Sequence, residues 1–566
     1  MTPNGSSSSV ANRADDVAED RPTDDPRLRV DLAAAGRLPP LPAAFLAGDD
    51  RDLLAPLTFL APGDDPPAAP PATPDRRELA AALATANRSY GHPRADELAA
   101  KLADPATRVV VTGQQAGLFA GPFYTLSKAL AAARWAAELE AAGGGDGRPA
   151  VAVFWVATED HDWAEASTAT VLTHQGPLTV GLGDDPQPLT PTGMRGLGAG
   201  VSEALSTLRQ AMPGERYAAW LDRVATWYRP DARFGEAFCR LMVGLLGERC
   251  PLLLDSMLPA VKAAERPWLA KLVARRREVE TAYAAADAEI EARGYPLQVS
   301  PQRGVSPLFL LAGGERRRIA WTAGEDGEEM ARFELRGSRR GPRPVAELEE
   351  IVADNPLAVS PGVLARPAIQ DAVLGTALFV LGPGECSYLP QVAPLYRALA
   401  IPAPAVALRP QSLVLESHQI DKLDEVGLTL GELLSDDDAL EGLLAARSGG
   451  GLTGAVRERV EALLGELEGP ALDLDPNLER PLAKTRDHVL GALDAFAGKV
   501  RSAAARRDEV TARRVGRLRD DLLPEGKMQE RVVSSLHFHG KYGDGFTDAC
   551  WRQLGLDGRV LQVVTP

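Results

Sequence analysis

The sequence predicts an α/β fold organised around a parallel β-sheet of the doubly wound type. Three short apolar runs, at residues 108–112, 151–156 and 377–381, have the composition of buried strands. An Ala- and Leu-rich stretch that favours a helix begins at Tyr124, between the first two runs. Strands that alternate with helices in this way are typical of a parallel sheet with helical crossovers.

The remaining core elements follow from the same patterns. "CPLLLDSM" at 250–257 predicts another buried strand, a long charged helix follows over about 258–293, and a further strand ends near Arg409. Helical pieces fill one insertion, and alternating apolar and polar residues predict a small antiparallel sheet in another. We therefore assign the core to residues 28–175, 249–294 and 346–414, the helical insertion to 176–248 and the β insertion to 295–345.

Both ends of the chain differ from this core. Residues 1–27 have no apolar segment and predict a disordered tail that is neither a signal peptide nor an anchor. Residues 526–566 are expected to fold back onto the body. Residues 415–525 predict a helical arm whose coiled-coil seam would be Val489, Leu493, Phe496, Val500 and Ala503. This seam allows two interpretations: the arm pairs with a second copy of the chain, or it packs only on itself as a hairpin.

Charge and cysteine content restrict the classes of function. The 566 residues carry a formal net charge of −16, which disfavours a broad nucleic-acid-binding surface. No run of about 18 apolar residues occurs, so no membrane span is expected. Four scattered cysteines without a CxxC pair predict a cytoplasmic protein without a Cys/His zinc site. His537 and His539 could be metal ligands on a strand, but an exposed turn or helix end is the favoured interpretation.

Polar residues follow the predicted strands where the strands end. Glu159, Asp160, His161 and Asp162 come soon after the apolar run 151–156. Ligands bind at the carboxyl ends of strands in open parallel sheets, so this cluster is expected to line a crevice. Its carboxylates could bind a substrate ammonium or nucleotide-borne Mg²⁺, and His161 could be a general base. A buried His161 bonded to a neighbouring carboxylate is the alternative.

The turn after the first strand is rich in glycine. Gly113, Gly117 and Gly121 match neither GxGxxG nor a P-loop. Backbone N–H groups ahead of a helix would suit a phosphate or carboxylate, and Gln114 and Gln115 could hydrogen-bond a ligand there. Close packing of the helix on the strand is the alternative role for these glycines.

One further stretch is a candidate wall of the crevice, and another carries a run of basic residues. The strand 377–381 runs into Gly382, Gly384 and Glu385, and Arg366 lies shortly before it. Residues 316–318 form a run of three arginines in the β insertion. A solvated hairpin edge is the default interpretation of this run, and contact with a phosphate or carboxylate is the more specific functional interpretation.

Four of these stretches resemble a known family. "VVVTGQQAGLFAGPFYTLSKAL", "VFWVATEDHDWAE", "LGPGECSYLPQ" and "LLPEGKMQERV" are similar to signature stretches of the bacillithiol biosynthesis cysteine-adding enzymes, BshC, from about residue 30 to the C-terminus. The resemblance implies a Rossmann-like core akin to class I aminoacyl-tRNA synthetases. It also implies two connecting-peptide insertions and a helical coiled-coil arm that forms a homodimer.

The resemblance implies a reaction as well. Cysteine would be activated with ATP and Mg²⁺ and joined to the amino group of glucosaminyl-malate, without zinc. Glu159, Asp160, His161 and Asp162 would surround the reacting amine. The binding residues would be Gln114, Gln115 and Gly117 at the nucleotide or sugar, with Arg366, Gly382, Gly384, Glu385 and Tyr388 closing the pocket. The HxGH and KMSKS signatures of the synthetases have no clear counterpart here.

Two other functions agree with the same residues. The acidic surface and long arm would also suit a non-catalytic dimeric scaffold or ligand sensor with a degenerate nucleotide-binding core. An amide ligase or nucleotidyl transferase that acts on another amino sugar is the second alternative. A pure scaffold has no need for "TEDHD" and "GPGE" at neighbouring strand ends, so we favour the enzyme.

Overall fold

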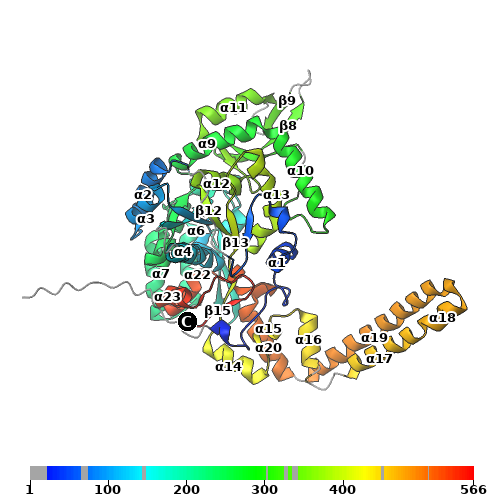
Figure 1. Ribbon diagram of the computed structural model, residues 1–566. Helices are drawn as coiled ribbons and strands as arrows, with labels where there is room; N and C mark the ends of the chain where they lie inside the picture. Colours follow the sequence, from blue (N-terminus) through cyan, green and yellow to red (C-terminus); the bar gives the residue numbers. More distant parts are fainter. Residues whose placement is uncertain are drawn as a thin grey trace, which may run out of the picture.

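A six-stranded parallel sheet forms the centre of the computed structural model (Figure 1). The structure describes residues 22–64, 74–142, 148–300, 304–323, 329–333, 342–445, 447, 452–507 and 509–566. In sheet order the strands are β1 (Thr58–Leu60), β13 (Ala405–Leu408), β12 (Thr376–Leu381), β2 (Arg108–Gln114), β3 (Ala150–Val156) and β6 (Leu252–Asp255). Each adjacent pair is parallel, which confirms the predicted sheet.

Helices cover both faces of this sheet because alternate strand residues point to opposite faces. Val110, Ala152 and Leu378 pack in one cluster with residues of α4, whereas Val109 and Val153 belong to the core on the other face. The helix on the first face is α4 (Tyr124–Ala142). Helices that contribute to the second core include α1 (Pro40–Ala47), α2 (Arg77–Tyr90), α3 (Ala95–Ala103), α9 (Pro259–Ala274), α12 (Arg366–Leu374) and α13 (Pro383–Ala398).

The segment expected to be one long helix after β6 is two helices. α9 ends at Ala274, and α10 (Arg276–Ala292) begins two residues later. The single-helix prediction is therefore wrong. The two parts have different partners, since α9 packs against α11 (Val345–Asp354) and α12, whereas α10 packs against α13.

The first insertion begins with a hairpin rather than a helix. β4 (Thr168–Thr173) pairs antiparallel with β5 (Gly176–Gly181), across the boundary that we placed after residue 175. Ala169 and Val171 are buried, and both are residue types that a hairpin packed against the body can bury on one face. A short helix, α5 (Trp163–Ala166), precedes it, and α6 (Gly200–Ala211), α7 (Glu215–Trp227) and α8 (Phe234–Leu246) follow.

The second insertion is an antiparallel sheet, as predicted. Its order is β10 (Arg343–Pro344), β9 (Glu329–Phe333), β8 (Glu315–Ala323), β7 (Val305–Ala312) and β11 (Val359–Pro361). The fifth strand, β11, lies beyond the expected end of the insertion at residue 345. This sheet and α10 stand over the carboxyl ends of the central strands, where they complete the wall of a cavity.

The arm projects away from the body as a pair of long helices (Figure 1). α17 (Leu452–Glu466) and α18 (Glu468–Leu474) pack along α19 (Glu479–Arg507). Within α19, Leu490 and Ala497 are buried, whereas Phe496 of the predicted seam is 58% exposed. At the base of the arm are α14 (Ser417–Val426), α15 (Leu430–Leu433), α16 (Asp437–Ala445) and α20 (Glu509–Leu522).

The two ends of the chain contact the body. Residues 1–21 of the predicted tail lie outside the described residues, but its last part does not behave as a tail. Pro22–Asp24 form a 3₁₀ turn, and Arg27 forms an ion pair of 2.7 Å with Asp424. At the other end, β15 (Gln562–Val564) pairs parallel with β14 (Ser412–Val414), after α21 (Gln529–Val532), α22 (Ser535–Tyr542) and α23 (Gly545–Gln553).

His537 and His539 lie on α22 and are buried, so the expected exposed position is wrong. His539 contacts Ser535 O at 3.0 Å and Thr547 Oγ1 at 2.9 Å. Burial lowers the pKa of His537 to about 3 and that of His539 to about 4, so both rings are neutral. No helix in the described part of the chain is both long and apolar enough to cross a membrane.

A buried ion pair connects the C-terminal segment to the central sheet, and its loss should destabilise the fold. Glu530 accepts two bonds from Arg409, at 2.7 and 2.9 Å, and two from Ser412, at 2.8 and 2.9 Å. We expect Glu530→Gln to lower the free energy of unfolding by about 3 kcal/mol, because it leaves a buried guanidinium without its counter-charge. Urea unfolding measures this change. The matched control is Glu525→Gln on the surface, and equal stability of the two variants would contradict the prediction.

Candidate functional site

The carboxyl ends of three neighbouring strands, β12, β2 and β3, open into one cavity of about 690 Å³. The three walls expected from the sequence therefore meet. Strands β7 and β8 and helix α10 supply the opposite side. The predicted residues that line the cavity are Gln114, Gln115, Glu159, Asp160, His161, Asp162, Arg366, Glu385 and Tyr388.

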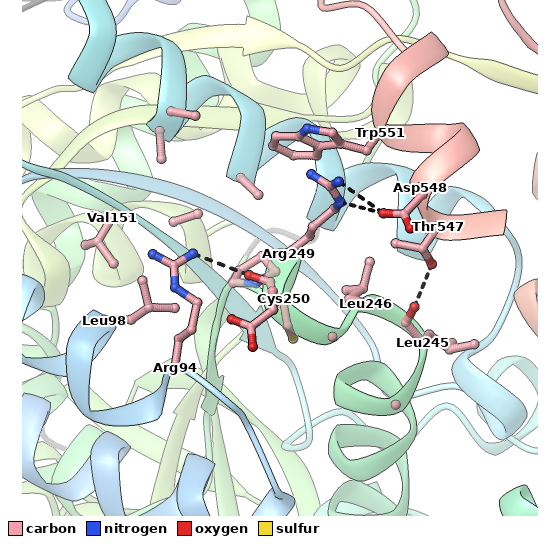
Figure 2. Close-up of a pocket in the computed structure, with 18 of the residues that line it drawn as sticks. Arg94, Leu98, Val151, Leu245, Leu246, Arg249, Cys250, Thr547, Asp548 and Trp551 are labelled. Carbon is pink, nitrogen blue, oxygen red and sulfur yellow. Dashed lines mark hydrogen bonds and ion pairs between the residues drawn. The ribbon is translucent and has the colours of Figure 1, made fainter. Parts of the chain in front are cut away.

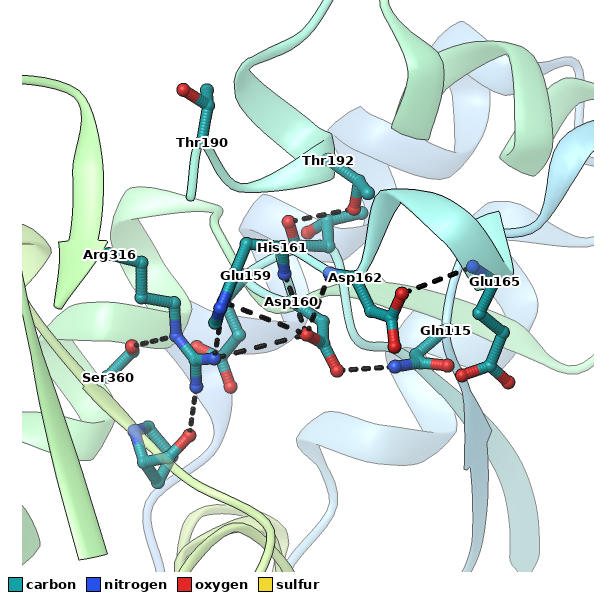
Figure 3. A network of polar contacts seen from close by, with 12 residues as sticks. Gln115, Glu159, Asp160, His161, Asp162, Glu165, Thr190, Thr192, Arg316 and Ser360 are labelled. Carbon is teal, nitrogen blue, oxygen red and sulfur yellow. Dashed lines mark hydrogen bonds and ion pairs between the residues drawn. The ribbon is translucent and has the colours of Figure 1, made fainter. Parts of the chain in front are cut away.

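Asp160 is the centre of a polar network at the end of β3 (Figure 3). Its Oδ1 accepts the backbone N–H of His161 at 2.7 Å, and its Oδ2 accepts a hydrogen bond from Gln115. Arg316 Nη1 lies 4.0 Å from Oδ1. Burial tends to raise the pKa of Asp160, but the Gln115 bond and the Arg316 charge outweigh it and hold the pKa below its usual value. Asp160 is therefore a fixed anion at the cavity wall.

His161 lies beside this anion and is neutral at physiological pH. Burial, and then the charge of Arg316, lower its pKa. Its Nδ1 is 3.3 Å from Arg316 Nη1, and a guanidinium can only donate. Nδ1 is therefore the acceptor, and the ring carries its hydrogen on Nε2. In this state His161 offers a donor to a ligand, and a general-base role would require the Arg316 contact to break.

Glu159 lies deeper than its neighbours. It is 3% exposed, and its Oε2 accepts a bond of 2.5 Å from Lys262 Nζ on α9. The same ammonium bonds Glu265 Oε2 at 2.8 Å. Glu159 Oε1 is buried and has no hydrogen-bond partner in the protein. The side chain thus joins a buried ionic cluster to the cavity that it lines.

The end of β12 is held by a second ionic cluster. Lys128 Nζ on α4 donates to Gly113 O at 2.8 Å, to Gln114 Oε1 at 3.1 Å and to Glu385 Oε2 at 2.5 Å. Arg366 lies 3.5 Å from the other Glu385 oxygen. Burial opposes ionisation of Glu385, but Lys128 and Arg366 lower its pKa below the usual range. Arg366 also contacts Tyr388 OH at 3.3 Å.

Three predicted glycines are outside the cavity lining. A Cβ on Gly117 would lie 2.9 Å from Gly121 Cα, so the two glycines let this turn close on itself. Gly382 caps α13 and donates its backbone N–H to Glu385 Oε2 at 2.8 Å. Gly384 belongs to the first turn of that helix. Their contribution is to position Glu385 at the cavity.

Two cationic residues of the site were not placed there by the sequence. Lys128 was part of an ordinary helical pattern. Arg316 had a hairpin edge as its default interpretation, but its side chain is only 7% exposed. It donates to Ser360 Oγ at 2.9 Å and Pro361 O at 2.8 Å, and it stacks 3.8 Å from the Phe309 ring centre. The strand alternation of residues 316 and 318, which both line the cavity, was the available signal.

The cavity contains both signs of charge. Its cationic residues are Arg276, Arg316, Arg318 and Arg366, and its acidic residues include Asp160, Asp162 and, on α10, Glu280, Asp287 and Glu291. Such a lining suits ligands that carry an ammonium group together with carboxylate or phosphate groups. The four cysteines, by contrast, are buried free thiols that do not line it. Within the described ranges no group of three or more His, Cys, Asp or Glu residues is arranged to hold a metal ion.

A second cavity, of about 680 Å³, lies at the amino ends of β3 and β6 (Figure 2). Its arginines pair with nearby carboxylates: Arg94 with Glu97 at 2.5 Å and Arg249 with Asp548 at 3.0 Å. Arg249 also stacks 4.6 Å from the Trp551 ring centre. Ligands of open parallel sheets bind at the carboxyl ends of the strands, which makes the cavity there the better candidate site.

Comparisons with known proteins agree with this architecture. Residues 68–410 match the family described as "Bacillithiol biosynthesis BshC, N-terminal Rossmann-like domain", and residues 412–555 match "Bacillithiol biosynthesis BshC, C-terminal coiled-coil domain". A solved structure described as a "putative arginyl t-RNA synthetase" from Campylobacter jejuni is 11% identical, with 85% of this chain and 98% of that chain covered. Its TM-score of 0.23 is too low to support a shared fold.

Curated relatives match along most of their length. Proteins named "Putative cysteine ligase BshC" are 32% identical in Solibacter usitatus (83% of this chain, 86% of the relative) and 30% identical in Salinibacter ruber (87% and 89%). One from Thermus thermophilus is 32% identical (85% and 96%). The two adjoining domain matches span most of the sequence, and the chain therefore belongs to the bacillithiol biosynthesis BshC family.

Proposed function

We propose that this protein is a cysteine ligase that joins the carboxyl group of cysteine to the amino group of glucosaminyl-malate, which forms bacillithiol. Family membership and the names of the relatives support cysteine and the bacillithiol pathway. The observation that carries the proposal is the single cavity in which the Asp160 anion lies beside the buried Arg316 cation. Amide formation needs an activated carboxyl group and a neutral amine in one place, and these charges can hold both reactants.

Each side of the cavity has a role in this proposal. Asp160, Asp162 and Glu159 hold the reacting ammonium group, and the neutral His161 donates from Nε2 to a substrate oxygen. Arg316 and Arg366 hold carboxylate or phosphate oxygens, with Gln115 positioning Asp160. ATP with Mg²⁺ activates cysteine as a co-substrate. Arg316 and Arg366 would hold its phosphates, and carboxylates such as Asp162 would be suitable ligands for its Mg²⁺.

We further propose that the protein works as a cytoplasmic homodimer. Five of its exposed large apolar residues lie on the arm, namely Val456, Leu463, Leu467, Leu474 and Phe496. Apolar side chains concentrated on a projecting helical pair favour association with a second copy. Four free thiols agree with a reducing compartment.

The proposed reaction is tested by incubating the purified protein with cysteine, glucosaminyl-malate and Mg-ATP. We expect mass spectrometry to show the condensed thiol, with ATP required. Asp160→Asn should lower kcat by about 100-fold, because it removes the charge that holds the amine while keeping the shape of the side chain. The thermal unfolding midpoint should stay close to that of the wild type.

The control for this variant is Asp231→Asn, which changes an exposed carboxylate on the surface of the first insertion. It should keep full activity. Undiminished turnover in folded Asp160→Asn would contradict the role of Asp160. Absence of the thiol with folded wild-type protein and all three reactants would overturn the proposed reaction.

The arm gives a separate prediction about assembly. The double variant Leu463→Glu/Phe496→Glu should convert the dimer into a monomer, because charge on an apolar seam opposes association. Analytical ultracentrifugation at micromolar concentration measures the mass. Leu357→Glu, at an exposed apolar residue of the body, is the matched control and should remain dimeric. A monomeric wild type would show that the hairpin packs only on itself.

A further inference from the structure

Three ionisable groups are buried together beneath the candidate site. Lys262 and Glu265 lie on the first turns of α9 and are 1% and 0% exposed, and Glu159 at the end of β3 is 3% exposed. One ammonium group serves both carboxylates, at 2.5 Å for Glu159 and 2.8 Å for Glu265. With all three groups ionised, this cluster carries one uncompensated negative charge.

A net charge at such depth is unfavourable, so the cluster has a high affinity for one more positive charge. Burial raises the pKa of Glu265 to about 7, even though Lys262 acts in the opposite direction. Both Glu159 Oε1 and Glu265 Oε1 are buried without a hydrogen-bond partner in the protein. Of the three residues only Glu159 lines the cavity, so it is the member of the cluster that adjoins a ligand bound there.

Other charged groups that face the cluster do not replace the missing positive charge. Arg316 comes from β8 and Arg366 from α12, and each acts electrostatically on Glu159. Both are shared with other acids, Arg316 with Asp160 at 4.0 Å and Arg366 with Glu385 at 3.5 Å. Asp255 at the end of β6 adds a further carboxyl group, and burial raises its pKa.

We propose that Glu159 is the group that takes the proton from the reacting ammonium, and that Lys262 and Glu265 are positioning residues that make it a proton acceptor. The inference rests on the proposed function. In this step one N–H bond of the substrate ammonium breaks, its electron pair stays on nitrogen, and the proton bonds to Glu159 Oε1. The cluster changes from a net charge of −1 to zero, and the neutral amine becomes the nucleophile. The proton returns to water after product release.

This assignment gives a role to a buried carboxylate oxygen, Glu159 Oε1, that has no hydrogen-bond partner in the protein. His161 Nδ1 already contacts Arg316, and Asp160 is held as an anion by Gln115 and Arg316. Both side chains therefore already have partners within the protein that occupy the atoms a proton would bind. The three neighbouring groups at the end of β3 thus have different roles. Asp160 binds the substrate ammonium, His161 donates a hydrogen bond to a substrate oxygen, and Glu159 accepts the proton.

The test compares kcat against pH for the wild type, Glu265→Gln and Glu265→Asp in the condensation assay. The wild type should lose activity as pH falls through about 7, because the cluster then takes its proton from water. Glu265→Gln removes one negative charge, so the proton affinity of the cluster falls. The fall in kcat on the acidic side of the pH profile, the acidic limb, should therefore move to lower pH. At pH 8 kcat should drop about tenfold or more, whereas KM for the amine should change less than about twofold. Glu265→Asp should restore both the limb and most of the rate.

Asp371→Asn is the matched control, because Asp371 is another buried acid, with a pKa raised by burial to about 6, that does not line the cavity. Its substitution should leave the limb in place. If the acidic limb and the kcat of Glu265→Gln equal those of the wild type, the proposal is overturned. A limb that moves with Asp371→Asn instead would overturn it as well.

An independent measurement separates this proposal from the proposed function. Infrared difference spectra of substrate-free protein should show the C=O band of a protonated carboxyl group that titrates near pH 7 and is absent in Glu265→Gln. If the protein forms no thiol but shows this band, the proposed reaction is contradicted and the proton-holding cluster is supported. If the wild type does not show the band, the proposed proton-holding cluster is contradicted, whatever the activity of the protein.

Discussion

The buried ammonium group of Lys128 joins the two central strands of the sheet at the candidate site. Its three N–H donors meet three acceptors: the backbone carbonyl of Gly113, the side chain of Gln114 and the carboxylate of Glu385. The first two belong to β2 and the third follows β12, while Lys128 itself comes from α4. A buried cation needs this complete set of partners, so the ends of both strands are fixed relative to one another.

Other features of the site depend on this arrangement. Glu385 can accept from Lys128 and from the backbone of Gly382 with the same oxygen, which fixes the start of α13. Its second oxygen then faces Arg366, which in turn reaches Tyr388. The ionic contacts thus extend from the middle of the sheet to the far wall of the cavity. The carboxylate of Glu385 thus faces two buried cations, Lys128 and Arg366, and balances part of their charge.

Local sequence patterns predicted the parts of the site that follow strands. Glu159–Asp162, Gln114, Gln115 and Glu385 directly continue apolar runs, and the rule for parallel sheets brings such ends together. The same patterns could not place Arg316, because it comes from an insertion more than 150 residues further along the chain and only tertiary contact buries it. Lys262 and Glu265 occur in a charged helix, where solvent exposure is the usual expectation. Gly117 lies outside the cavity lining and close to Gly121, and the sequence does not distinguish such a packing contact from a ligand contact, because a glycine suits both.

The roles of neighbouring side chains at the end of β3 follow from the protein groups that each of them contacts. Asp160 has donors on its protein side, and these favour its anion. His161 has a guanidinium at Nδ1, which fixes the hydrogen on Nε2 and excludes proton uptake at the bonded nitrogen. Glu159 shares the ammonium group of Lys262 with a second carboxylate, Glu265, and its Oε1 has no hydrogen-bond partner in the protein. Four consecutive polar residues can therefore perform different chemistry, because helix α9 and strand β8 approach the same strand end from different sides.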